Sequence, residues 1–167
     1  MESAEVRLRL GPFVVEIGRW VYGTVILMTV LVVYADDGPV SFGEAAGVVA
    51  APLIATFLAH LFSVIMAAES GKHGGLNRRE LAYLVRSEAQ FLMLALPPFV
   101  VLLVGALGAF TPRVAVSLIL WGGVALLVFV GGFAGRRVGL GWWGVAASAA
   151  GSGTIGLVVL VAQLLLK

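Results

Sequence analysis

The chain has 167 residues, of which 60% are hydrophobic and only 12% are charged, and its mean hydropathy is +1.06. Soluble domains carry about 25% charged residues because charge keeps their surface in water, so this composition excludes a water-soluble globule. The net charge of +2 is too small to favour a nucleic-acid partner, and the absence of cysteine excludes disulfides, thiolate metal sites and cysteine nucleophiles.

Five stretches of the chain are long and apolar enough to cross a bilayer as helices, which takes about 20 residues at a rise of about 1.5 Å per residue. They run continuously rather than alternating with polar residues, which excludes the strands of a membrane barrel. We therefore predict an all-α, polytopic membrane protein that forms a single membrane domain over residues 1–167. The five predicted spans are about residues 11–35, 45–68, 89–110, 114–134 and 138–166.

The first of these stretches is predicted to be a retained span rather than a signal peptide. Glu16 and Arg19 interrupt it, and it is too long for the apolar part of a typical signal peptide.

The basic residues fall unequally on the two sides of this arrangement, which predicts its orientation. Only Arg113 and Lys167 lie on one side. We therefore predict a cytoplasmic N-terminus, an external C-terminus and a cytoplasmic loop over residues 69–88. Abundant alanine, glycine and valine, with far more arginine than lysine, favour a GC-rich source and the plasma (inner) membrane of a bacterium. The basic residues on the predicted cytoplasmic side are Arg7, Arg9, Lys72, Arg78, Arg79, Arg86, Arg136 and Arg137.

Short motifs predict where the third span begins and bends. Asn77 followed by Glu80 is a capping box, which predicts a helix that starts near Arg78 in water. The Pro97-Pro98 pair predicts a kink near mid-membrane, because proline lacks the N–H that a helix interior needs.

Aromatic and small residues predict the membrane boundaries and the helix contacts. Trp142-Trp143 is expected at the inner interface and Tyr34 near the outer one. The stretches Gly105–Gly108, Gly131–Gly135 and Gly151–Gly153 are small-residue patches that allow helices to approach closely. The expected partners are therefore the lipid bilayer and, through these glycine-rich faces, a second copy of the chain.

The first candidate site consists of Glu16, Arg19 and His60, together with Ser63, which shares a helix face with His60. Placing an ionisable residue inside a bilayer costs about 2.5–3.5 kcal/mol on insertion scales, so such residues indicate a functional site. Arg19 and His60 each lie about 12 Å from the cytoplasmic end of their predicted spans, and Glu16 lies about one turn shallower. We predict that these side chains form a polar seam along an ion or proton path. Alternatively, Glu16 and Arg19 neutralise one another, and a neutral His60 bonds to a backbone carbonyl.

The predicted inner loop is a second candidate. It carries Glu69, His73, Glu80 and Glu88, and carboxylates with an imidazole suit a divalent cation. Their spacing is irregular and the loop is rich in glycine, which is typical of a connector, so this metal site is the weaker hypothesis. The outer Asp36-Asp37 pair is interpreted as a solvated turn. No cofactor is expected.

No enzymatic activity is expected either. Ser152 lies in a Gly-Ser-Gly run and would need His60 as its base, but their predicted depths differ by about 9 Å, too far for the hydrogen bond that activates a nucleophile. The chain has no His-Glu-x-x-His motif, phosphate loop or paired-aspartate motif.

Five spans with the N-terminus inside, two short strings and a fifth helix rich in small residues resemble the vacuolar iron transporter family. Residues 19–23, Arg-Trp-Val-Tyr-Gly, are similar to the opening of that family's first helix, and residues 63–70, Ser-Val-Ile-Met-Ala-Ala-Glu-Ser, to the end of its second. The resemblance implies that Met66 and Glu69 are metal-path residues. The chain departs from the family at Thr24-Val25-Ile26, where the family has Asn-Asp-Gly, and it lacks the long cytoplasmic helical insertion. It also looks like small integral membrane proteins common in GC-rich bacteria.

Two functions fit these observations. The first is a transporter or channel for a small ion, a proton or a divalent metal, with Arg19 as fixed charge, His60 as titratable group and Glu16 as partner. The second is a non-transporting structural or partner-binding membrane protein, which would make its contacts through the inner loop and the Arg136-Arg137 turn.

Overall fold

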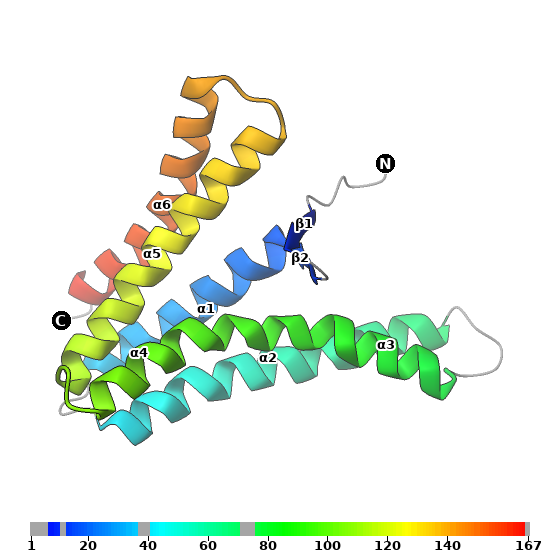
Figure 1. Ribbon diagram of the computed structural model, residues 1–167, viewed down its shortest axis with the longest axis horizontal. Coiled ribbons are helices and arrows are strands. Elements are labelled where there is room, and N and C mark those ends of the chain that lie inside the picture. Colours follow the sequence, from blue (N-terminus) through cyan, green and yellow to red (C-terminus); the bar gives the residue numbers. More distant parts are fainter. Residues whose placement is uncertain (1–6, 11–12, 37–40, 71–75, 166–167) are drawn as a thin grey trace.

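The computed structural model of the chain is shown in Figure 1 and describes residues 7–10, 13–36, 41–70 and 76–165. Apart from two short strands, the described elements are helical. In chain order they are β1 (Arg7–Leu10), β2 (Phe13–Glu16), α1 (Ile17–Asp36), α2 (Phe42–Ser70), α3 (Arg78–Glu88), the 3-10 helix η1 (Ala89–Ala95), α4 (Leu96–Ala106), α5 (Pro112–Arg137) and α6 (Trp142–Leu165).

The N-terminal part of the predicted first span is not helical. β1 and β2 form an antiparallel pair, in a register that places Arg7 opposite Glu16. The prediction of a helix from residue 11 is therefore wrong, and α1 begins at Ile17. The physical reason lies in the residue pattern: β1 alternates charged and apolar side chains with a period of two, and β2 opens with phenylalanine and two valines, which favour strands.

The helices form two antiparallel hairpins with α1 between them (Figure 1). α2 pairs with the continuous stretch α3–η1–α4, α5 pairs with α6, and α1 contacts both hairpins. The hairpins come together where α4 leads into α5 and diverge toward the opposite end. Arg78 and Arg137 lie at the diverging end of their hairpins, whereas Arg113 lies at the end where the hairpins meet.

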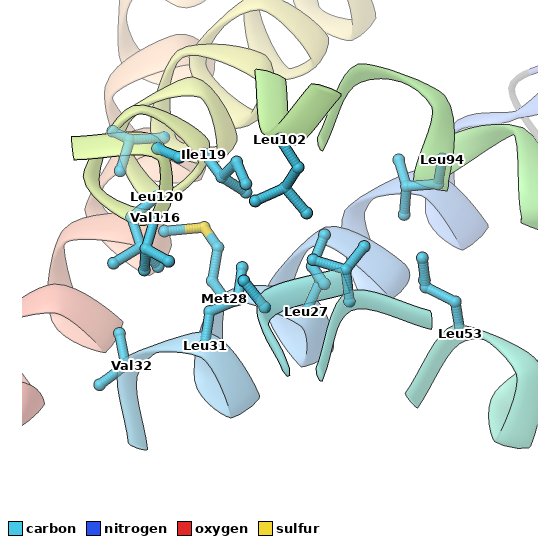
Figure 2. Close-up of a cluster of buried hydrophobic side chains, with 14 of the residues drawn as sticks. Leu27, Met28, Leu31, Val32, Leu53, Leu94, Leu102, Val116, Ile119 and Leu120 are labelled. Atoms are coloured by element: carbon cyan, nitrogen blue, oxygen red, sulfur yellow. The ribbon is translucent and has the colours of Figure 1, made fainter. Parts of the chain in front are cut away.

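The apolar core surrounds the middle of α1. Figure 2 shows Met28 and Leu31 extending from α1 into a cluster that includes Leu102 of α4 and Ile119 of α5. Met28 fits against α5 because residue 123 is glycine: a Cβ at Gly123 would lie 2.6 Å from the sulfur of Met28. α1 is therefore the element on which both hairpins pack.

Small residues join α5 to α6. The Ser148 hydroxyl donates to the backbone carbonyl of Gly131 over 2.8 Å. A Cβ on Gly131 would lie 2.6 Å from the carbonyl oxygen of Ser148, and one on Gly153 would lie 2.6 Å from the side chain of Val128. The predicted patches at Gly131–Gly135 and Gly151–Gly153 thus supply close contacts within one chain.

Capping boxes define the first residues of two helices, α3 and α2. The predicted box at the start of α3 is confirmed, because the Asn77 side chain accepts from the backbone of Glu80 while the Glu80 carboxylate accepts from the Asn77 N–H. A second box, not predicted, opens α2 through Ser41 and Glu44. The Glu44 carboxylate also accepts from the Tyr34 hydroxyl at 3.2 Å, which ties the end of α1 to the start of α2.

The helix changes type directly before the Pro97-Pro98 pair. Seven residues form the 3-10 segment η1, and α4 then begins with the prolines in its first turn. Because neither proline has an N–H, and each ring crowds the carbonyl four residues earlier, the α-helical pattern cannot run through this point undisturbed. The Leu96 N–H instead bonds to Met93, three residues back.

Four of the described helical stretches are long and apolar enough to cross a membrane: residues 42–70, 78–106, 112–137 and 142–162. α1 contributes a shorter apolar helix, Trp20–Ala35. Large apolar side chains cover the outer faces; Phe62, Trp121 and Phe129 are 65%, 61% and 68% exposed. Apolar faces of this extent are compatible with an integral membrane protein whose helices contact lipid.

Candidate functional site

A carboxylate and an imidazole meet where α3 passes into η1. Glu88, the last residue of α3, has a side chain that is only 3% exposed, and its Oε2 lies 3.7 Å from Nε2 of His60 on α2. This distance exceeds a direct hydrogen bond but allows an ion pair when the imidazole is protonated. The His60 side chain is 50% exposed, so the pair has one enclosed member and one accessible member.

The burial of Glu88 follows from the face that α3 turns toward α2. Glu80, Leu84 and Glu88 are four residues apart and therefore lie on one side of the helix. Glu80 and Leu84 are partly buried and Glu88 is buried, whereas Arg79 and Tyr83 next to them are exposed. Glu88 thus belongs to the packed face of an otherwise polar helix, at the point where the chain becomes apolar.

The structure changes the predicted relation between Glu16 and Arg19. Glu16 ends β2, one residue before α1 starts, so the two residues do not share a face of one helix as predicted. Arg19 lies in the first turn of α1, an element that contacts both α2 and η1. The side chains of Glu16 and Arg19 lie outside the described part of the structure, so their meeting with His60 stays a prediction.

Ser63 and Met66 follow His60 along α2 and are both exposed. Two hydroxyls of α2 and α1 bond to their own helix: Thr56 donates to the carbonyl of Pro52 at 2.7 Å, and the buried Thr24 donates to that of Trp20, also at 2.7 Å. These hydroxyls are therefore satisfied locally, whereas His60 and Glu88 bring two ionisable groups together between α2 and α3.

The described residues give no support to the hypothesis of a metal site in the inner loop. Among them, no group of three His, Asp or Glu side chains is arranged to hold a metal ion. Glu80 binds the backbone at the start of α3, and Glu69 is exposed near the end of α2. His73 lies outside the described residues, so a site that includes it stays a prediction.

Ser152 and His60 belong to different hairpins. Ser152 packs against Gly131 of α5, and His60 faces α3.

Glu88 is the residue whose role sequence reasoning missed. It was expected in water, as one of four loop residues with an irregular spacing. The available signal was its position four residues after Leu84 on the apolar side of a helix whose start the capping box had already fixed. The identity of its neighbour, His60, depends on how α2 and α3 align, which the sequence pattern alone does not determine.

Comparisons of the chain with protein families, with curated proteins and with solved structures found no match. The resemblance to the vacuolar iron transporter family therefore stays a prediction.

Proposed function

We propose that this chain moves protons across the membrane, with Glu88 and His60 as the groups that carry them. The observation that supports the proposal is the nearly complete burial of Glu88 beside a half-exposed imidazole, 3.7 Å away, in a bundle of apolar helices. Ionisable groups at such positions are costly, and in membrane proteins they commonly mark proton relays.

The two side chains have complementary properties for this task. An imidazole can both accept and donate a proton, and a carboxylate can accept that proton at short range. His60 would exchange protons with the accessible side, and Glu88 would pass them to and from the interior of the bundle. Arg19, in the first turn of α1, is proposed as the fixed charge that excludes other cations.

We propose five spans with the N-terminus inside. α1 has 20 residues, which at about 1.5 Å each cover about 30 Å, the thickness of the hydrocarbon core. The described arginines of the α3 start and the α5 end lie at the diverging tips of the two hairpins, away from the point where the hairpins meet, and the exposed Trp142-Trp143 pair follows at the start of α6. Basic residues and tryptophans at these tips favour the cytoplasmic interface, here that of a bacterial plasma membrane.

The competing function is a membrane protein that does not transport. One observation favours it: among the described residues, every buried side-chain nitrogen and oxygen of the bundle has a hydrogen-bond partner. Such satisfaction is what a static scaffold requires. In that case the His60–Glu88 contact would only hold α2 against α3.

Reconstituted liposomes distinguish the two functions. We expect the parent chain to admit protons faster than protein-free liposomes under an imposed potential, and not to admit sodium, potassium or divalent cations. The His60→Ala and Arg19→Ala variants should be slower for protons. Equal leakage of every ion in all three proteins and in empty liposomes would end the transport proposal in favour of the scaffold. Faster entry of a metal ion than of protons would overturn the choice of substrate.

A further inference from the structure

A surface pocket lies where the end of α2 meets the start of α3. Its volume is about 420 Å³, and its walls are almost entirely apolar. Neither His60 nor Glu88 lines it, and Glu88 lies about one turn beyond Leu84 along α3. The pocket is lined by Ala68, Leu76, Arg79, Glu80, Tyr83 and Leu84.

The lining of the pocket carries one positive side chain, Arg79, and one negative side chain, Glu80, and further arginines lie beside it on α3. The Glu80 carboxylate is held by the backbone N–H of Asn77 at 3.1 Å, as part of the capping box. Arg79 is exposed beside it, and Tyr83 and Arg86 follow at four and seven residues, which places all three on one exposed face of α3. An apolar pocket with arginines and a phenol along its edge suits a ligand with an apolar part and an anionic part.

The depth at which the pocket lies in the membrane indicates that this ligand is a lipid. α2 has 29 residues and is therefore about 43 Å long, which matches a bilayer of about 40–45 Å including its headgroups. The α2–α3 end of the hairpin then lies among the phosphates of the leaflet that the basic residues select as cytoplasmic, a leaflet that attracts arginine through its anionic lipids.

We propose that this pocket binds an anionic phospholipid. The phosphate would lie against Arg79 and within reach of Tyr83 and Arg86, and part of an acyl chain would lie along Ala68 and Leu84. The inference depends on the membrane placement proposed above but not on proton transport. Its test therefore measures lipid binding directly, so that failure of one proposal leaves the other standing.

The experiment titrates the full-length chain in detergent with phosphatidylglycerol and counts bound lipid by native mass spectrometry. Phosphatidylcholine and inorganic phosphate are the comparison ligands. We expect phosphatidylglycerol to bind more tightly than either, and Arg79→Gln to weaken it about fivefold, the effect expected for removal of one arginine near an anionic headgroup. Equal binding of both lipids, or binding of phosphate as tight as that of lipid, would overturn the proposal.

Two further variants separate the pocket from a general effect of charge. Arg136→Gln removes the same charge at the tip of the other hairpin, and should leave binding unchanged. Ala68→Trp fills the pocket without changing charge, and should weaken binding as Arg79→Gln does. If Arg136→Gln weakens binding as much as Arg79→Gln, or if Ala68→Trp, still folded by circular dichroism, binds like the parent, the pocket is not the site.

Discussion

Glu88 and His60 lie 3.7 Å apart across the joint between two antiparallel helices, at the residue where polar α3 gives way to the apolar 3-10 segment η1. The contact pairs a buried carboxylate with an exposed imidazole. The two residues that hold α2 against α3 are therefore also the residues that we propose to carry protons.

The topology predicts which ends of the molecule share a compartment. A reporter fused after Lys167 should be external, and one inserted within residues 71–75 should be cytoplasmic, because an odd number of spans separates them. Alkaline phosphatase activity at one position and fluorescence of a cytoplasmic reporter at the other would be measured in cells. If both positions report the same side, one of the three spans between them does not cross, and the proposed orientation fails.

The contact between α5 and α6 predicts opposite effects at neighbouring glycines. Gly131→Ala places a Cβ 2.6 Å from the carbonyl oxygen of Ser148, so the helices must separate. We expect a loss of about 1–3 kcal/mol in the free energy of unfolding, measured by reversible denaturation in mixed micelles.

Gly132→Ala is the matched control for this prediction. Its Cβ would lie 3.4 Å from that of Ala149, an ordinary contact. This variant should be as stable as the parent or slightly more stable, because alanine has the higher helix propensity. Equal stability of the two variants would contradict the close packing of α5 on α6.

The Asn77 capping box predicts a local effect on α3. The Asn77 side chain accepts from the backbone N–H groups of Arg79 and Glu80, both at 2.9 Å. Asn77→Ala should cost about 1 kcal/mol, and the two amides should exchange with solvent about fivefold faster. Asn77→Asp keeps the acceptor and should exchange at the parent rate, as measured by hydrogen exchange. Unchanged exchange in Asn77→Ala would show that the cap does not hold the helix start.

Local signals in the sequence predicted much of this fold, because they depend on residues close together in the chain. The Asn77–Glu80 box gave the start of α3, and continuous apolar runs gave the four long helical stretches. The error at Glu16 has a similar local origin: apolar content was taken as helical, although the valines of β2 favour a strand equally well.

The long-range contacts were not predictable in the same way. Ser148 bonds to Gly131 and His60 lies beside Glu88 because of how particular helices align, and a pattern of apolar residues does not fix that alignment. The depth estimate named His60 as a candidate residue, and the structure places it beside Glu88. It assigned Glu88 to water because the predicted span began one residue later.

The measurement that tests the account most directly is potential-driven proton entry into liposomes that contain the Glu88→Gln variant. This substitution keeps the size of the side chain and removes its ability to accept a proton. Glu44→Gln, which can keep the capping box of α2, makes the same change in the first turn of α2, far along that helix from His60. The account predicts that Glu88→Gln falls to the rate of empty liposomes while Glu44→Gln matches the parent. Proton entry through Glu88→Gln at the parent rate would contradict it.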